Sequence, residues 1–103
     1  MRVISISTLV AFWERPEFKD AEVPLRAWLK EVRSADWSQP SDIKAQFGNA
    51  SILKNRRVVF NIKGNDYRLV VAVAYTFQAV YIKFVGTHAE YDRVDVQTVE
   101  VSE

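Results

Sequence analysis

The chain has 103 residues, of which 49% are hydrophobic and 26% charged, a composition typical of one globular domain. It has no cysteine and a single histidine, which excludes disulfides and thiolate metal sites and argues against any metal centre. The formal net charge of +1 does not by itself indicate a nucleic-acid partner. We expect one domain over residues 1–103 and no metal or other cofactor.

Charge is unevenly distributed along the chain. Residues 1–50 carry seven basic and seven acidic groups, residues 51–87 six basic and one acidic, and residues 88–103 one basic and five acidic. The pattern predicts a basic central region followed by an acidic tail. The first residues lack a signal-peptide pattern and no apolar run is long enough to span a membrane. We therefore expect a cytoplasmic protein with no membrane partner.

The first half of the chain predicts helices. Val3-Ile4 is compatible with an edge strand, and Ser7 is expected to cap a helix over Thr8–Glu14 that ends at Arg15-Pro16. A second helix is predicted over Ala21–Ser34. Its buried stripe is expected to be Leu25, Trp28, Leu29 and Val32. Its outer side carries Arg26, Lys30 and Arg33, which form a solvated face more often than an RNA contact.

A short third helix is predicted before the sheet. Pro40 opens it, Asp42–Phe47 forms it and Gly48 ends it, with Trp37 in the core before it. Residues 49–55 then lead into the strands.

Three antiparallel strands are predicted next: Arg57–Lys63, Asp66–Thr76 and Val80–Thr87. A two-residue turn at Gly64-Asn65 places Asn61 opposite Arg68.

The turn also sets Val59 opposite Val70 and Arg57 opposite Ala72. If Phe77-Gln78 is the whole of the next loop, Lys83 pairs with Ala72 and Thr87 with Arg68.

Alternation of side chains divides this sheet into two faces. The first face is apolar and is expected to carry Val58, Phe60, Ile62, Tyr67, Leu69, Val71, Val73, Val80, Ile82 and Phe84. The second face is expected to carry Arg57, Asn61, Lys63, Arg68, Val70, Ala72, Tyr81, Lys83, Val85 and Thr87. Helices should cover the first face, giving a two-layer α+β domain that leaves the second open. The second face is either ordinary solvated surface or a shallow basic trough for a phosphate backbone.

The end of the last strand carries the only histidine. Thr87 and Glu90 have capping-box spacing, so a helical turn is predicted there, with His88 and Tyr91 projecting from one side. A single histidine in a chain is more often an exposed surface residue or a cap contact than a functional group. The following residues alternate only partly, so the tail is predicted to be either a frayed helix or an edge strand.

These segments together resemble the HigB family of type II toxins. The resemblance rests on R-V-V-F-N-I-K-G-N-x-Y-R-L-V-V, on V-Y-I-K-F-V-G-T-H-A-E-Y-D, and on A-D-W-x-x-P-x-D-I-K at Ala35–Lys44. The preceding L-R-A-W and F-W-E fit as well, so it extends from about Ser7 to Asp95. It implies the RelE/ParE-like fold, with N-terminal helices packed on one face of an antiparallel sheet.

The resemblance also implies a function. It implies an mRNA interferase, an endoribonuclease that cuts messenger RNA on the translating ribosome without a metal. It implies a HigA-type helix-turn-helix antitoxin as partner, with operator DNA contacted only through the antitoxin complex.

Metal-free RNA cleavage needs a cation at the phosphate, a base and an acid. The catalytic candidates are Arg68, His88, Tyr91 and Lys83. The RNA-binding candidates are Asn61, Lys63, Arg57 and Arg56. Arginine suits a two-pronged phosphate contact, and histidine titrates near neutrality. Two other functions remain open on the residues alone: a gyrase inhibitor of the same fold class, and a toxin that binds RNA or antitoxin without cleaving.

Overall fold

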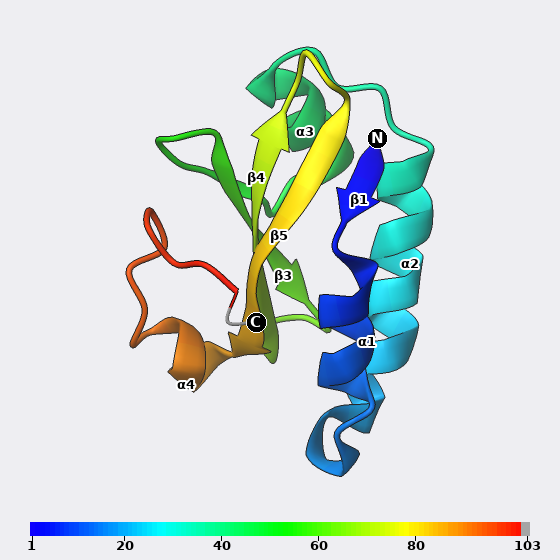
Figure 1. The fold of residues 1–103 in the computed structure, drawn as a ribbon, viewed down its shortest axis with the longest axis vertical. Helices are drawn as coiled ribbons and strands as arrows, with labels where there is room; N and C mark the ends of the chain where they lie inside the picture. Colours follow the sequence, from blue (N-terminus) through cyan, green and yellow to red (C-terminus); the bar gives the residue numbers. More distant parts are fainter. Residues whose placement is uncertain (102–103) are drawn as a thin grey trace.

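The computed structural model describes residues 1–101 as helices arranged around a five-stranded sheet of order β1-β5-β4-β3-β2 (Figure 1). The elements are β1 (Arg2–Ile4), α1 (Ile6–Trp13), the 3₁₀ helix η1 (Pro16–Ala21), α2 (Glu22–Arg33), α3 (Pro40–Gln46), β2 (Ser51–Ile52), β3 (Arg57–Ile62), β4 (Tyr67–Ala74), β5 (Ala79–Thr87) and α4 (His88–Tyr91).

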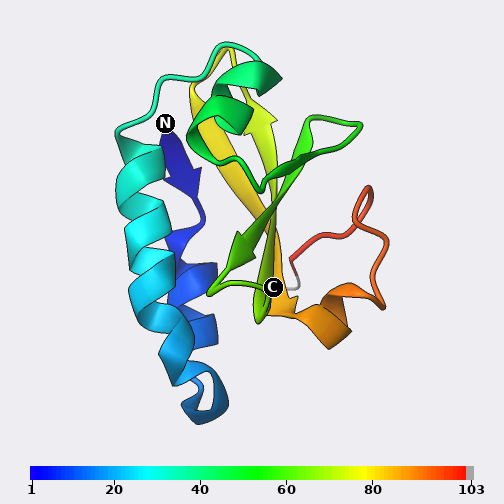
Figure 2. The same cartoon turned by 180° about the vertical axis from the view of Figure 1, so that it is seen from behind.

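Helices α1 and α2 lie side by side on one face of the sheet, which confirms the predicted two-layer α+β arrangement (Figures 1 and 2). The sheet is mixed rather than purely antiparallel, because β1 pairs with β5 in parallel. The three central strands are antiparallel as predicted, and the edge strand expected at Val3-Ile4 forms as β1, with a parallel direction that the prediction did not specify. A three-residue strand far from its partner in sequence gives no periodic signal that would reveal its direction.

Helix α2 packs through the stripe predicted from its spacing. Leu25, Trp28, Leu29 and Val32 are all buried. The Trp28 ring meets Phe60 of β3 edge to face, with the ring centres 5.4 Å apart. Such aromatic pairs stabilise a core beyond the area that they bury, so this contact fixes α2 on the first face of the sheet.

Two features of the N-terminal half differ from expectation. Helix α1 begins at Ile6 rather than Thr8, and the chain forms η1 where we expected only an end at Arg15-Pro16. Proline is tolerated at the first position of a helix because its missing N–H has no intrahelical partner there. The ring of Phe18 stacks on Phe12 with centres 4.5 Å apart, which holds η1 against α1.

The β3–β4 register is the predicted one. Asn61 lies opposite Arg68, and Val59 lies opposite Val70. The loop between the two strands is longer than the expected two residues, because β3 ends at Ile62 and β4 begins only at Tyr67. Lys63 has φ 52°, a left-handed conformation that cannot continue a strand.

The predicted β4–β5 register is wrong. The loop is residues 75–78, so that Ala72 pairs with Tyr81 rather than with Lys83. A β-bulge near Val70 and Val71 then makes Lys83 an extra residue in β5. The turn is wider because Gln78 has φ 52° and its side-chain amide donates to the Trp37 carbonyl at 2.7 Å. Neither the backbone conformation of Gln78 nor its bond to Trp37 can be predicted from the alternation of side chains along the strands.

The bulge exchanges the faces of the residues that follow it. Phe84 pairs with Val70 on the second face, where we had expected it on the first. Val85 packs against the core of the first face, where we had expected it on the second. Thr87 likewise pairs with Tyr67 of the first face, although it was predicted to face Arg68 on the second. The bulge therefore corrects the predicted faces of all three residues.

The second face is not open, contrary to expectation. The C-terminal segment (residues 93–101) forms turns rather than a helix or a strand, and it lies across the sheet from α1 and α2 (Figures 1 and 2). Arg57 of β3 donates to the carbonyl oxygens of Val96 and Val99. Val59 and Val70, which belong to this face, are 3% and 0% exposed. The segment thus covers part of the second face.

None of the helices in residues 1–101 combines the length and the apolarity that a membrane crossing requires.

Candidate functional site

Helix α4 is fixed at the end of β5 by the predicted capping box. Thr87 Oγ1 accepts from the Glu90 N–H at 3.1 Å, and Glu90 Oε1 accepts from the Thr87 N–H at 2.9 Å. The backbone N–H of His88 also donates to the Asp66 carbonyl at 3.2 Å. These bonds satisfy donors at the helix start and attach α4 to the β3–β4 loop.

Gly86 allows α4 to sit this close to the sheet. It lies opposite Arg68, and a Cβ there would come within 2.6 Å of the Phe84 ring and 3.0 Å of Glu90 Oε1. Atoms do not approach so closely without displacement, so the absence of a side chain at this position keeps the cap intact.

Arg68 and Tyr91 meet at this end of the second face. The Arg68 guanidinium lies 5.7 Å from the centre of the Tyr91 ring, within the range of a cation–π contact. It also donates to the Asn65 carbonyl at 3.2 Å. Asn61 stands opposite Arg68 on β3. The structure therefore brings a cation, a phenol and an amide to the same end of the sheet, as the sequence predicted.

His88 begins α4 and Tyr91 ends it, so the two share one side of its single turn. The imidazole is exposed, and its Nε2 lies 3.4 Å from Asp92 Oδ2. A neighbouring carboxylate can orient an imidazole ring. We call Arg68, His88 and Tyr91 the α4 site.

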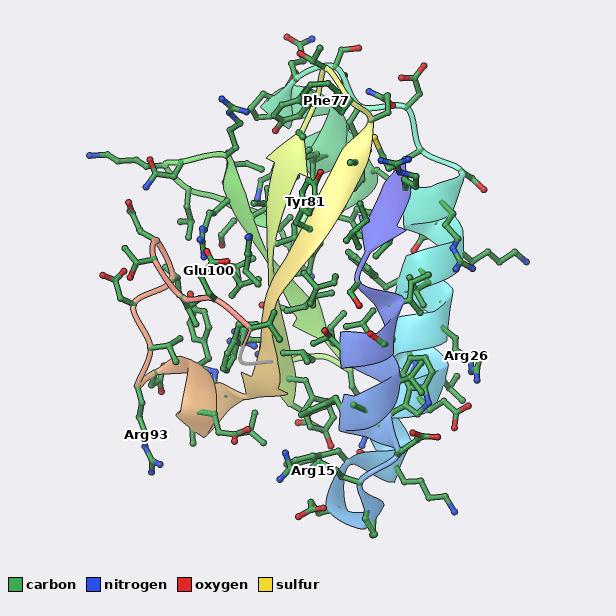
Figure 3. All side chains as sticks on the ribbon, viewed as in Figure 1. Arg15, Arg26, Phe77, Tyr81, Arg93 and Glu100 are labelled. Atoms are coloured by element: carbon green, nitrogen blue, oxygen red, sulfur yellow. The ribbon has the colours of Figure 1, made fainter. Side chains whose placement is uncertain are left out.

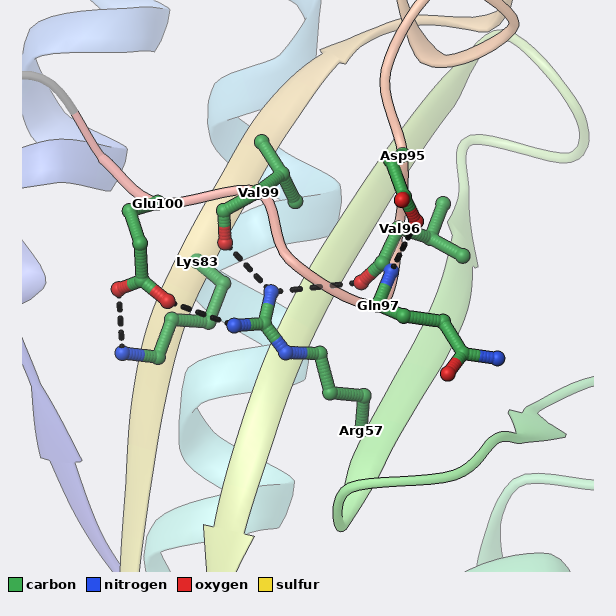
Figure 4. Close-up of polar contacts among 7 residues, drawn as sticks. All are labelled: Arg57, Lys83, Asp95, Val96, Gln97, Val99 and Glu100. Carbon is green, nitrogen blue, oxygen red and sulfur yellow. Dashed lines mark hydrogen bonds and ion pairs between the residues drawn. The ribbon is translucent and has the colours of Figure 1, made fainter.

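Arg57 and Lys83 are engaged by a residue that the sequence did not single out. Glu100 Oε1 accepts from Lys83 Nζ at 2.7 Å, and Glu100 Oε2 accepts from Arg57 Nη2 at 2.6 Å (Figure 4). The hydrogen bond from Lys83 and then that from Arg57 lower the pKa of Glu100. The only available signal was the acidic tail that follows a basic sheet.

Lys63 does not join the second face, which corrects its predicted position. Its ammonium lies 2.6 Å from Asp20 Oδ2 in η1 and 3.5 Å from Asp66 Oδ2. Tyr67 also donates to Asp20. The left-handed backbone at Lys63 ends the strand alternation, and its side chain pairs with the helical layer.

Asp20, Lys63 and Tyr67 form a cluster in which all three pKa values are shifted. The hydrogen bond to Asp20 raises the pKa of Lys63. Hydrogen bonds from Lys63 and from Tyr67 lower the pKa of Asp20. Burial, followed by the hydrogen bond to Asp20, raises the pKa of Tyr67 to about 12. These groups join η1 to the β3–β4 hairpin.

Arg56 lies in the turn before β3, with φ 58°, and is exposed. Together with Ala72 and Tyr81 it lines a hollow of about 420 Å³. Tyr81 also lines a neighbouring hollow of about 660 Å³ that includes Lys83 and Glu100. Figure 3 shows Tyr81 on β5 and Glu100 on the segment that crosses the sheet. Tyr81 was placed on this face from sequence but was not recognised as a site residue.

Within residues 1–101, the acidic and histidine side chains form no group of three or more that could hold a metal ion.

Comparison with known proteins identifies relatives. A family model described as "HigB_toxin, RelE-like toxic component of a toxin-antitoxin system" matches residues 21–94. The "mRNA interferase HigB" of Escherichia coli O6:H1 is 22% identical over 80 residues, which cover 76% of this chain and 78% of that protein. The "mRNA interferase toxin HigB" of Escherichia coli K12 is 38% identical over 58 residues, or 54% of this chain and 56% of that protein.

Proposed function

Because the chain belongs to the HigB family of RelE-like toxic components of toxin–antitoxin systems, we propose that it is an endoribonuclease that cleaves messenger RNA. The names of its relatives describe mRNA interferases. The observation that carries the proposal is the α4 site, where Arg68 packs against Tyr91 beside His88 at the end of a basic sheet. A cation beside two proton-transferring groups is the set that RNA cleavage requires.

The reaction uses the RNA's own 2′-hydroxyl as the nucleophile. A base removes its proton, the 2′-oxygen bonds to phosphorus, and the bond to the 5′-oxygen breaks as an acid protonates that oxygen. The products are a 2′,3′-cyclic phosphate and a 5′-hydroxyl. Arg68 stabilises the charge on the phosphate oxygens, with arginine suited to contacting two of them at once. His88 and Tyr91 transfer the two protons.

We propose that cleavage depends on the ribosome. Affinity for free RNA rests on the number of phosphates that cations neutralise. Here the ion pairs of Arg57 and Lys83 with Glu100, and of Lys63 with Asp20, already engage three of the basic groups. Free RNA should therefore bind weakly, and the ribosome would supply the messenger in a fixed position.

We further propose that the protein acts in the cytoplasm as one domain over residues 1–103. Its inhibitor would be a HigA-type helix-turn-helix antitoxin. Induced expression should halt growth, and co-expression of that antitoxin should restore it. Normal growth in the presence of folded, full-length protein would contradict a toxin of any kind.

The decisive experiment compares two substrates. Purified protein is incubated with messenger on programmed ribosomes and with the same RNA alone, at physiological salt, and new 5′-hydroxyl ends are mapped. We expect cleavage of the ribosome-bound message to be much faster. Growth arrest with intact messages and a DNA-damage response would instead indicate a gyrase inhibitor. Arrest with RNA bound but uncut would indicate a toxin that only binds.

A further inference from the structure

The carboxylate of Glu100 accepts from two different cations, one on each of its oxygens. Arg57 on β3 and Lys83 on β5 come from strands separated by β4, and a single anion bridges them (Figure 4). Lys83 is placed for this by the β-bulge, which makes it the extra residue in β5. The two side chains thus form a cradle that binds an anion with two oxygens.

A phosphodiester offers the same two-oxygen contact. Its two non-bridging oxygens accept from arginine and lysine in the way that a carboxylate does. Taking the proposed function as given, we propose that Arg57 and Lys83 form a phosphate subsite for RNA, which Glu100 occupies in the free protein. RNA then binds by displacing the C-terminal segment.

The burial of Arg57 favours an exchange of anions over simple opening. Its side chain is only 8% exposed, and it also donates to the Val96 and Val99 carbonyls. A buried cation left without a partner is costly. The segment can therefore leave at low cost only when another anion takes the place of Glu100.

Glu100 is the exposed partner of the bridge. Its side chain is 59% exposed, whereas those of Lys83 and Arg57 are 23% and 8% exposed. An incoming anion can therefore approach the two cations from the solvent side, where Glu100 lies. A strand of RNA that delivers a phosphate together with further contacts can therefore compete with it.

The neighbouring surface has room for the rest of a nucleotide. Tyr81 lies opposite Ala72, and both residues line the hollow that Arg56 also lines. Because the side chain of Ala72 is small, the Tyr81 ring is accessible from this hollow. Aromatic rings of this kind stack on unpaired RNA bases. A phosphate between Arg57 and Lys83 would thus lie next to a stacking surface for its base.

Two single substitutions test the exchange. Glu100→Gln removes the competing charge but keeps the size of the side chain. Asp95→Asn removes one charge from the same segment at a residue that accepts from the Gln97 N–H instead of from the two cations. The probe is a single-stranded RNA oligonucleotide with 2′-O-methyl groups, which binds without being cut, measured by fluorescence anisotropy.

We expect Glu100→Gln to bind this RNA about fivefold more tightly or better. In the wild type, Glu100 fills the subsite in most molecules, and the apparent affinity for RNA is reduced to the fraction of molecules in which the subsite is free. Asp95→Asn should change affinity by less than about twofold, since only long-range charge is altered. Adding Lys83→Ala to Glu100→Gln should abolish the gain. A mainly structural role for Glu100 instead predicts lower thermal stability with unchanged RNA affinity.

A second measurement follows the segment directly. In the wild-type protein, ¹⁵N relaxation of residues 96–101 should show a rigid backbone that becomes mobile when the RNA is added. A segment that stays rigid with RNA bound would overturn the proposal, and so would equal affinities of Glu100→Gln and wild type. If the wild type still cuts ribosome-bound message in that case, only the subsite is refuted. If it neither binds nor cuts RNA, the proposed function falls too.

Discussion

The guanidinium of Arg68, in the middle strand of the sheet, faces the ring of Tyr91, the last residue of α4, at 5.7 Å. This contact joins the sheet to the turn that carries His88. The role toward RNA that we propose for Arg68 therefore has to be separated from its contact with Tyr91.

Replacing Arg68 by alanine should lower the cleavage rate on programmed ribosomes by roughly 10²-fold or more, if the loss resembles that of a transition-state donor. Arg68→Lys keeps the positive charge but loses the planar guanidinium that can contact two oxygens at once. Its cleavage rate should therefore lie between those of the wild type and Arg68→Ala. Lys30→Ala, at an exposed residue of α2 on the far side of the sheet, is the matched loss of charge and should cleave like wild type. A wild-type rate for Arg68→Ala would place the site elsewhere.

The contributions of the ring and of the hydroxyl group of Tyr91 can be tested separately. Tyr91→Phe keeps the ring against Arg68 but removes the hydroxyl to which we assign proton transfer. We expect the cleavage rate to fall about 10²-fold, the lower end for a general acid or base. His88→Ala should lose a similar factor. Both variants should melt within a few degrees of wild type, because neither residue is buried. Full activity in Tyr91→Phe combined with a defect in Tyr91→Ala would assign Tyr91 to the positioning of Arg68 alone.

Gly86→Ala should damage the site through the backbone. The added methyl group would meet the Phe84 ring at 2.6 Å and Glu90 Oε1 at 3.0 Å, so the cap of α4 must shift. We expect a loss of about 1–3 kcal/mol in the free energy of unfolding, measured with urea, together with reduced cleavage. Gly48→Ala is the control, since a Cβ there meets nothing within 4 Å.

Tyr67 should make the protein lose stability in alkali. Burial and the bond to Asp20 raise its pKa to about 12, above its ordinary value of 10.0. Between these values the unfolded chain has lost the phenolic proton while the native state retains it. The free energy of unfolding should therefore be steady below pH 10 and fall as the pH rises toward 12. Tyr67→Phe should flatten that fall, and an unchanged slope would show that other groups cause it.

Local patterns predicted much of this fold. The stripe of α2, the Asn61–Arg68 register and the Thr87–Glu90 box each depend on neighbours in sequence or on one short turn. Such features are encoded where they occur. The ends of the elements were less accurate by one or two residues.

The remaining errors share a physical cause. The place of Lys63, the bulge at Lys83 and the path of the C-terminal segment depend on contacts with distant residues, among them Asp20 and Glu100. Spacing along the chain does not carry that information. The sequence therefore predicted that Arg68, His88 and Tyr91 lie at one end of the sheet. It did not predict that the acidic side chain of Glu100 would pair with Arg57 and Lys83.

The bulge has a consequence for any scan of single substitutions along β5. Before it, even-numbered positions such as Val80 and Ile82 point into the core, whereas beyond it the odd-numbered Val85 does. Damage to folding should thus follow one phase up to Lys83 and the opposite phase after it. Deleting Lys83 would remove the bulge and join Ile82 to Phe84, which already pair with the consecutive residues Val71 and Val70. Each remaining residue of β5 would then keep its partner and its face, so the deletion should disturb the core less than an insertion at the same place, which would turn the residues beyond it to the opposite face.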